Sequence, residues 1–341
     1  GAGVVLGNAI PECVALAEKL DAAVCNNYQH NDSFPGSHPL AVGPRGYNGS
    51  KAGMELVAKA DVVLALGTRL NPFSTLPGYG IDYWPKNAKI IQVDINADRI
   101  GLTKPVTVGI CGDAKLVAQG ILAQLAPTAG DAGRAERKAL IHQTKSRWLQ
   151  TLSSMDHEDD DEGTTWNADA RKREPDRMSA RQAWRAIQAG LPKNAIISSD
   201  IGNNCAIGNA YPTFEQGRKY LAPGLFGPCG YGFPSIIGAK IGNPDTPCVG
   251  FAGDGAFGIS MNEMSSIGRE EWPGVTMIVF RNYQWGAEKR NSILWFDDNF
   301  VGTELDPHLS YAKVAVACGL KGVQVRTPVE LTEARRESCE A

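Results

Sequence analysis

Two short segments carry polar and glycine residues of the types that bind a metal-bound diphosphate. Gly253-Asp254-Gly255 follows the apolar run 247–251, which is predicted to be a strand. Asn282 follows a second apolar run, 275–280, and stands 28 positions after Asp254. If a helix joins the two strands, both side chains lie just beyond their carboxyl ends, where open α/β sheets bind ligands.

The residue types at this edge favour magnesium and phosphate. The two glycines allow the backbone to approach a phosphate closely, and N–H groups at the start of a following helix can donate to its oxygens. Asp254 offers a carboxylate oxygen and Asn282 an amide oxygen. Magnesium takes few protein oxygens and leaves the rest of its octahedron to phosphate and water. Two unrelated tight turns are the alternative, but the strand–helix–strand spacing favours one joint site.

The elements that position this site form a predicted α/β unit over residues 179–341. Its first helix begins after Ser179, a good N-cap residue, and ends at Gly190. A strand follows and leads into the loop 200–204, which precedes the two strands described above. The predicted elements are helices 180–189 and 261–267 and strands 195–199, 247–251 and 275–280.

Residues 1–125 show a second alternation of helices and buried strands, which predicts a doubly wound parallel sheet. Residues 126–178 are predicted to be a charged linker that is helical over 130–150. Within it, the acidic run 157–163 is either solvated or a metal-binding cluster; the alternating ligand spacing of a calcium loop is absent, which favours the solvated reading. The elements expected in the first unit are helices 11–20 and 51–60 and strands 22–25, 61–66 and 88–94.

Length and composition limit the classes of protein. A chain of 341 residues predicts two domains. Its net charge of −3 gives no long-range attraction to nucleic acid or anionic membranes. The absence of a long apolar run or a basic-then-apolar leader predicts a cytoplasmic protein. The eight cysteines and five histidines show no paired ligand spacing, so neither a structural zinc site nor a disulfide framework is expected.

The motifs resemble those of the thiamine diphosphate-dependent enzymes. Besides the Gly-Asp-Gly and Asn pattern, the turn 226–234 resembles the glycine-rich turn of that superfamily. Residues 1–125 resemble the central domain of its acetolactate synthase and pyruvate oxidase group, with characteristic loops at 67–69 and 93–96. Longer stretches resemble the sulfoacetaldehyde acetyltransferase family within this group: 28–32, 35–39, 69–75 and 284–291. The resemblance covers nearly the whole chain.

This resemblance implies a set of site residues. Asp254, Asn282 and the backbone carbonyl of Gln284 would bind Mg²⁺. An activating glutamate is expected on an amino-terminal domain outside this chain, so Glu263 and Glu288 are not given that role. Cys229 is smaller than the apolar residue usual at its position, and a packing role is favoured over a redox one. The residues expected to contact thiamine diphosphate are Ile201, Gly202, Asn203, Asn204, Gly227, Cys229, Gly253, Asp254, Gly255, Ala256 and Asn282.

The implied activity is conversion of sulfoacetaldehyde and phosphate to acetyl phosphate and sulfite, a transferase reaction of taurine degradation. The implied assembly is a homodimer or homotetramer. Both substrates are anions, and Arg281, Lys289 and Arg290 are the candidate anion binders, with a solvated face as the alternative. For the loop residues His30 and His38, a structural role is favoured over substrate contact.

Two other functions remain open at this point. One is an acetolactate-synthase-like carboligase that acts on a 2-oxo acid. The other is a non-catalytic nucleotide- or flavin-binding module, although Leu6 stands where a third glycine of the fingerprint after Gly1 and Gly3 belongs. The resemblance also implies that a pyrimidine-binding domain and the extreme carboxyl terminus lie outside this chain. The chain alone is therefore expected to be inactive.

Overall fold

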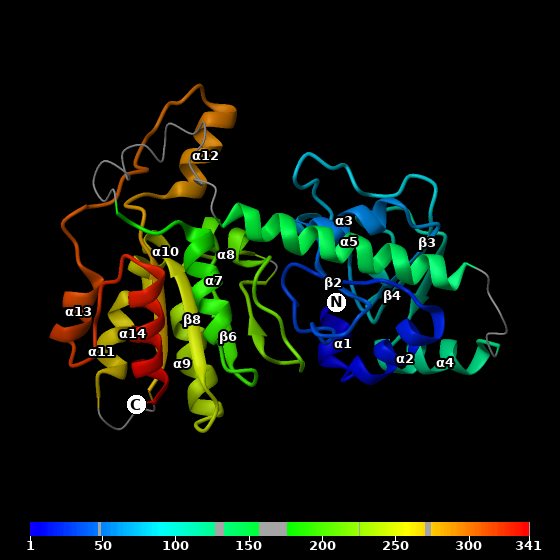
Figure 1. Ribbon diagram of the computed structural model, residues 1–341, viewed down its shortest axis with the longest axis horizontal. Helices are drawn as coiled ribbons and strands as arrows, with labels where there is room; N and C mark the ends of the chain where they lie inside the picture. The colour runs from blue at the N-terminus through cyan, green and yellow to red at the C-terminus, as the bar shows by residue number, and fades with distance from the viewer. Residues whose placement is uncertain (47–48, 127–132, 157–175, 225, 270–273, 341) are drawn as a thin grey trace. The chain divides into compact units, whose positions relative to one another are not determined.

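The computed structural model describes residues 1–46, 49–126, 133–156, 176–224, 226–269 and 274–340. The chain divides into two compact units (Figure 1). Unit 1 comprises Gly1–Ser153 and Pro212–Tyr220, and unit 2 comprises Ser154–Tyr211 and Leu221–Ala341. A short segment between α8 and β7 therefore belongs to unit 1, while the chain on both sides of it belongs to unit 2.

Unit 1 contains two parallel sheets. Strands β3 (Val62–Leu66), β4 (Lys89–Asp94) and β5 (Val108–Cys111) form one, in the order β3-β4-β5. Strands β1 (Val24–Asn26) and β2 (Ala41–Pro44) form the other. Parallel strands joined by helices confirm the predicted α/β class. The helices are α1 (Ala2–Leu6), α2 (Ile10–Leu20), α3 (Lys51–Ala58), α4 (Ala114–Gln124) and α5 (Arg134–Met155), with 3₁₀ turns η1 (Pro72–Ser74) and η2 (Ala97–Arg99).

The core of unit 1 packs α2 and α4 against β4. Leu16, Val93 and Ala118 are almost completely buried there. The residues expected to form a charged linker include α5, which buries Ile141 and Trp148. The acidic run 157–163 lies outside the described residues.

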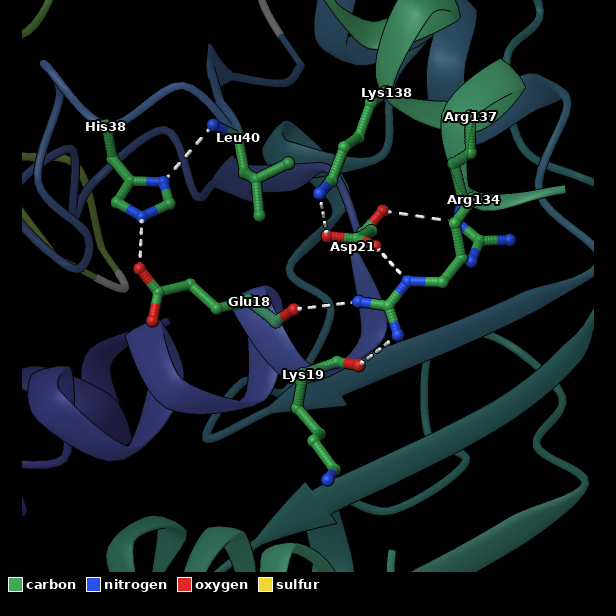
Figure 2. A network of polar contacts seen from close by, with 8 residues as sticks. All are labelled: Glu18, Lys19, Asp21, His38, Leu40, Arg134, Arg137 and Lys138. Atoms are coloured by element: carbon green, nitrogen blue, oxygen red, sulfur yellow. Dashed lines mark hydrogen bonds and ion pairs between the residues drawn. The ribbon is translucent and has the colours of Figure 1, made fainter. Parts of the chain in front are cut away.

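An ionic cluster joins the start of α5 to the end of α2 (Figure 2). Asp21 ends α2 in the left-handed conformation, and its buried carboxylate binds Arg134 and, at 3.0 Å, Lys138. The Arg134 guanidinium also donates to the carbonyl of Lys19 at 3.4 Å. Cations near the carbonyl end of a helix satisfy acceptors that have no partner within the helix. We call Asp21, Arg134 and Lys138 the Asp21 clamp.

His38 lies beside this clamp and has structural partners (Figure 2). Its Nδ1 accepts the backbone N–H of Leu40 at 3.1 Å, so its proton resides on Nε2, which lies 3.3 Å from Glu18 Oε1. Its ring packs edge-on against Phe34. These contacts agree with a structural role.

The Asp21 clamp should make the free energy of unfolding depend on pH. Burial alone raises the pKa of Asp21, but hydrogen bonds from Lys138 and Arg134 outweigh it and hold that pKa below its ordinary value. Because the folded-state pKa is the lower one, this stabilisation is complete above the unfolded pKa of about 3.9 and disappears as pH falls through the folded value. The free energy of urea unfolding should therefore be lower for Asp21→Asn than for wild type at neutral pH, and the difference should vanish in acid.

Asp98 provides the control for this experiment, because its side chain is exposed, and Asp98→Asn should match wild type throughout. A difference between wild type and Asp21→Asn that persists unchanged into strong acid would contradict the clamp.

Unit 2 contains a four-stranded sheet in the order β7-β6-β8-β9. Strands β6 (Ile196–Ser199), β8 (Cys248–Gly253) and β9 (Thr276–Phe280) are parallel, and β7 (Tyr220–Leu221) is short. The helices are α7 (Ala180–Gly190), α8 (Asn203–Gly208), α9 (Gly232–Gly242), α10 (Asp254–Ser260), α11 (Met264–Ile267), α12 (Gly286–Trp295), α13 (Tyr311–Ala317) and α14 (Pro328–Glu340), with the 3₁₀ turn η3 (Met261–Glu263).

Local signals explain where helix α7 of unit 2 begins. Ser179 caps α7 as predicted: its hydroxyl accepts the N–H of Gln182 at 3.1 Å, and the Gln182 side chain accepts the N–H of Ser179 at 2.9 Å. Each of these bonds satisfies a backbone donor that has no partner within the helix. Trp184 on the same helix is 2% exposed and packs on Phe251 of β8, with ring centroids 4.6 Å apart. Helix α7 therefore packs on the sheet through a large aromatic side chain.

Two predicted boundaries were wrong. The helix expected over 261–267 is preceded by α10, which begins at Asp254 itself, and the loop expected over 200–204 ends where α8 begins at Asn203. Both early helical turns contain glycine or asparagine, which are poor helix formers. Packing against the sheet stabilises them: α10 buries Ala256 and Phe257, and α8 buries Cys205.

Candidate cofactor-binding site

The Asp254 carboxylate joins two loops at the carboxyl edge of the unit 2 sheet. Strands β8 and β9 pair in parallel with Gly253 opposite Phe280, so both strands end at the same level. Asp254 is 3% exposed, and its Oδ1 accepts the N–H of Gly255 at 3.1 Å. Its Oδ2 accepts the N–H groups of Asn282 at 3.2 Å and Tyr283 at 2.7 Å. The two segments selected from the sequence therefore lie together.

The oxygens at this point form a donor set that could hold magnesium. Burial raises the pKa of Asp254 to about 6, although its backbone hydrogen bonds favour the ionised form. Asn282 is half-buried, and its Oδ1 accepts a long 3.3 Å bond from the N–H of Gln284. Among the described residues, no group of three or more His, Cys, Asp or Glu side chains could hold a metal ion. Mg²⁺ usually takes its remaining oxygens from a bound phosphate and water.

Gly255 is required by close packing. A Cβ atom at this position would lie 2.8 Å from the ring of Trp285, which follows the β9 loop. The Trp285 ring therefore lies directly against the first turn of α10. This contact fixes the start of α12 relative to the Gly-Asp-Gly segment.

A second carboxylate organises the neighbouring loops. Asp200 follows β6, is completely buried, and accepts the N–H groups of Ile201 at 2.9 Å, Gly230 at 3.1 Å and Gly232 at 2.7 Å. It thereby fixes the glycine-rich turn to the end of β6. Gly202 has φ +121°, a conformation that strongly favours glycine.

Asn204 is a buried side chain with an unused donor. It is 7% exposed, and its Nδ2 has no hydrogen-bond partner among the described residues. A Cβ atom on either Gly202 or Gly253 would lie 3.4 Å from its Oδ1, so the amide lies near both the β6 loop and the β8 loop. Leaving such a donor unsatisfied costs about 1–3 kcal/mol. An anionic oxygen would satisfy it, so these residues fit a diphosphate.

Cys229 lies in the glycine-rich turn beside Gly227, whose φ is +66°. Partial burial and the negative charges of Asp200 and Glu288 raise the pKa of the Cys229 thiol. The thiolate, which is the reactive form, is therefore disfavoured. The Cys229 side chain is exposed, so its packing role stays a prediction.

Two of the three candidate anion binders have partners within the chain. The Arg281 guanidinium donates to the carbonyls of Pro307, at 2.9 Å, and Leu309, and it stacks on the ring of Tyr283. Lys289 is 4% exposed, and its ammonium binds the carboxylate of Glu304 and Gln284 Oε1 at 3.2 Å. The contacts of Arg281 and Lys289 orient the loop that follows Asn282.

Arg290 is exposed and forms no ion pair with another described residue. It is thus the candidate whose guanidinium is available to a ligand.

Three further residues that support the site were not predicted from the sequence. Asp200 could have been found by the rule used for Asp254, since it too directly follows a buried strand. Trp184 donates from Nε1 to the carbonyl of Asn204 at 3.1 Å, and the Tyr311 hydroxyl donates to the carbonyl of Asp254 at 2.7 Å. Both lie on helices distant in sequence, where no local pattern indicates the contact.

Among solved structures, the fold is similar to the thiamine diphosphate-dependent 4-hydroxybenzoylformate decarboxylase of Rhodococcus jostii RHA1, with a TM-score of 0.72 and 21% identity. The alignment covers 100% of this chain and 58% of that one. At this identity the likeness concerns the fold alone.

Curated relatives are more similar in sequence. The probable sulfoacetaldehyde acetyltransferase of Rhizobium meliloti is 81% identical over 100% of this chain and 58% of its own length. The sulfoacetaldehyde acetyltransferase of Roseovarius nubinhibens is 76% identical, over 98% of this chain and 55% of its length. A probable acetolactate synthase large subunit of Methanocaldococcus jannaschii is 29% identical, over 99% and 54%. The chain thus spans 54–58% of the length of these relatives.

Two family models match the chain. Residues 1–121 match the central domain of thiamine pyrophosphate enzymes, and residues 200–341 match their C-terminal TPP binding domain. The second match contains Asp254, Asn282, the glycine-rich turn and the whole β6 loop. The chain therefore belongs to the thiamine pyrophosphate enzymes, of which it carries the central and the C-terminal TPP-binding domains.

Proposed function

We propose that the protein containing this chain is a thiamine diphosphate- and Mg²⁺-dependent acetyltransferase that converts sulfoacetaldehyde and phosphate to acetyl phosphate and sulfite. One observation carries the choice of substrate. Relatives named sulfoacetaldehyde acetyltransferase are 45–81% identical over nearly all of this chain. Relatives named acetolactate synthase large subunit are only 25–29% identical over the same region.

In this proposal, Asp254, Asn282 and the Gln284 carbonyl hold Mg²⁺. When bound, thiamine diphosphate supplies a carbon nucleophile and an electron sink. The unused amide of Asn204, which lies near both Gly202 and Gly253, supports a diphosphate position between the β6 and β8 loops. The chain's own residues would bind and orient the cofactor; the other proposed contacts are Ile201, Gly202, Asn203, Gly227, Cys229, Gly253 and Ala256.

A substrate comparison tests the proposed activity. The full-length protein with Mg²⁺ and thiamine diphosphate should release sulfite from sulfoacetaldehyde and form acetyl phosphate only when phosphate is present. It should release little carbon dioxide from pyruvate. The opposite preference would support a carboligase and refute the acetyltransferase.

Arg290→Ala should raise the Michaelis constant for phosphate or sulfoacetaldehyde in the full-length enzyme. A charge-assisted hydrogen bond to an anion contributes about 1.5–3 kcal/mol, which corresponds to roughly a 10- to 100-fold increase. Initial-rate kinetics would measure it, with cofactor affinity unchanged because Arg290 does not contact the metal loop in this proposal. Arg336→Ala, an exposed arginine on α14, is the matched control. Unchanged Michaelis constants in Arg290→Ala would exclude this role.

We also propose the remaining properties that the family resemblance implies: a cytoplasmic location, a role in taurine degradation, and a homodimer or homotetramer. In the part of the chain that the structure describes, no helix is both long and apolar enough to cross a lipid bilayer. Size-exclusion chromatography with light scattering would measure the assembly directly.

A further inference from the structure

An open pocket of about 410 Å³ adjoins the loops that hold the candidate cofactor site. It lies between α12 and the segment that follows that helix. Trp285, which packs against Gly255, lines one side of it. The remaining lining residues are Glu288, Asn291, Ser292, Phe296, Val301, Gly302 and Thr303. Trp285 is thus the residue shared by this pocket and the packing around the Gly-Asp-Gly segment.

The lining of the pocket includes an unsatisfied polar group. Thr303 is 5% exposed, and its hydroxyl has no hydrogen-bond partner among the described residues. A buried hydroxyl without a hydrogen-bond partner costs free energy unless a ligand or water supplies the missing bond. The pocket is therefore suited to a small polar molecule.

Glu288 is the acidic side chain of this pocket. It lies in the first turn of α12, is exposed, and its carboxylate forms no hydrogen bond or ion pair with another described residue. Its negative charge adds to burial and to the charge of Asp200 in raising the pKa of the Cys229 thiol. By contrast, Glu263 has its carboxylate oxygens hydrogen-bonded by Asn262 and Ser266.

The reaction under Proposed function, on which this inference rests, requires two proton transfers at carbon. Sulfoacetaldehyde carries its sulfonate on a methylene group beside the aldehyde carbon. In the products the former aldehyde carbon is an acyl carbon bonded to a phosphate oxygen, so it has lost its hydrogen as a proton. The carbon–sulfur bond has broken, its electron pair has left with sulfite, and the methylene carbon has gained a proton to become a methyl group. The proton of hydrogen phosphate is released, and the equation balances without an oxidant or reductant.

A negative side chain suits proton transfer better than the binding of these anionic substrates. A carboxylate repels both sulfonate and phosphate but can accept a proton and return one. We propose that Glu288 is the group that removes the proton from the aldehyde carbon and delivers a proton to the neighbouring carbon. Its place in the lining of the pocket allows one carboxylate to serve both adjacent carbons.

Glu288→Gln in the full-length enzyme tests this role. The side chain keeps its size but can no longer accept the proton, so kcat for sulfite release should fall about 100-fold or more. The kinetic isotope effect with substrate deuterated at the aldehyde carbon should increase, because proton removal becomes slower. Glu288→Asp should retain part of the activity. Affinity for thiamine diphosphate and thermal stability should be unchanged, and Glu263→Gln, the matched control, should behave as wild type.

A second measurement tests the position of the carboxylate without any turnover. In the protein freed of cofactor, removing the negative charge should lower the pKa of the Cys229 thiol and speed its alkylation by iodoacetamide near neutral pH. Peptide mass spectrometry would follow Cys229, with exposed Cys111 in unit 1 as the internal reference. Glu263→Gln should not change the rate.

The outcomes separate the two proposals. If wild type releases sulfite and Glu288→Gln does so equally fast, the proton-transfer role is wrong although the proposed function stands. If alkylation of Cys229 is the same in Glu288→Gln and wild type, the position of Glu288 is wrong. If wild type releases no sulfite from sulfoacetaldehyde, the proposed function fails and this role fails with it.

Discussion

Asp254→Asn is expected to abolish sulfite release and to weaken Mg²⁺-dependent binding of thiamine diphosphate at least about 100-fold. Changing groups that only support metal ligands typically costs 10–100-fold in affinity, and removing a direct carboxylate ligand should cost at least the upper end. The substitution also halves the acceptor capacity of a side chain that receives three backbone N–H bonds. The Asn282 loop should therefore lose both the metal and its connection to β8.

Asp113→Asn is the matched control for this experiment. Asp113 also follows a parallel strand and caps a helix, accepting the N–H groups of Lys115 and Leu116, but it lies in unit 1. It should lower stability slightly without changing cofactor affinity. Calorimetric titration of both variants would measure the affinities. If Asp254→Asn kept wild-type affinity in the presence of Mg²⁺, Asp254 would not be a metal ligand.

Trp184→Ala is expected to lower the free energy of unfolding of unit 2 by about 3–5 kcal/mol, the usual cost of truncating a buried tryptophan. Trp184 is 2% exposed and packs on Phe251 and Phe280, at 4.6 and 5.4 Å between ring centroids. These two rings belong to β8 and β9, the strands that precede Asp254 and Asn282. Loss of the indole should therefore also loosen the edge of the sheet that holds the candidate site. Urea unfolding followed by circular dichroism would measure the change.

Trp184→Phe separates the two consequences of that change. It keeps an aromatic ring in the core but removes the Nε1 donor to the carbonyl of Asn204. Most of the stability should return, since a phenylalanine fills much of the volume. Cofactor affinity should stay below wild type, because the β6 loop has lost one of its tethers. If Trp184→Ala unfolded at the same urea concentration as wild type, the packing account of unit 2 would be wrong.

The central pair of the site could be predicted because it depends on sheet geometry. Asp254 and Asn282 each follow an apolar run, and parallel neighbouring strands bring their carboxyl ends together. The structure places Asp254 Oδ2 within 3.2 Å of the Asn282 N–H, so the proximity was confirmed. Asp200 also directly follows a buried strand, but its role could not be predicted. The N–H groups that donate to its carboxylate, those of Gly230 and Gly232, come from a turn about 30 residues further along the chain.

Other features could not be predicted from local pattern. Helix α10 begins at Asp254 although Gly255 and Gly258 lower its intrinsic helicity, because burial of its first turns stabilises it. Arg281 and Lys289 looked like free cations near the metal loop. Their partners, the carbonyls of Pro307 and Leu309 and the carboxylate of Glu304, lie 15–28 residues further along the chain. Only the folded chain shows that these cations orient the loop.

Titration calorimetry of the cofactor-free, full-length protein tests the central claim most directly. If Asp254, Asn282 and the surrounding loops hold a diphosphate through Mg²⁺, thiamine diphosphate should bind when Mg²⁺ is present and should bind far more weakly when the metal is chelated. Thiamine without its diphosphate should bind weakly under both conditions. Equal affinities for thiamine diphosphate with and without the metal, or for thiamine and its diphosphate, would contradict the account.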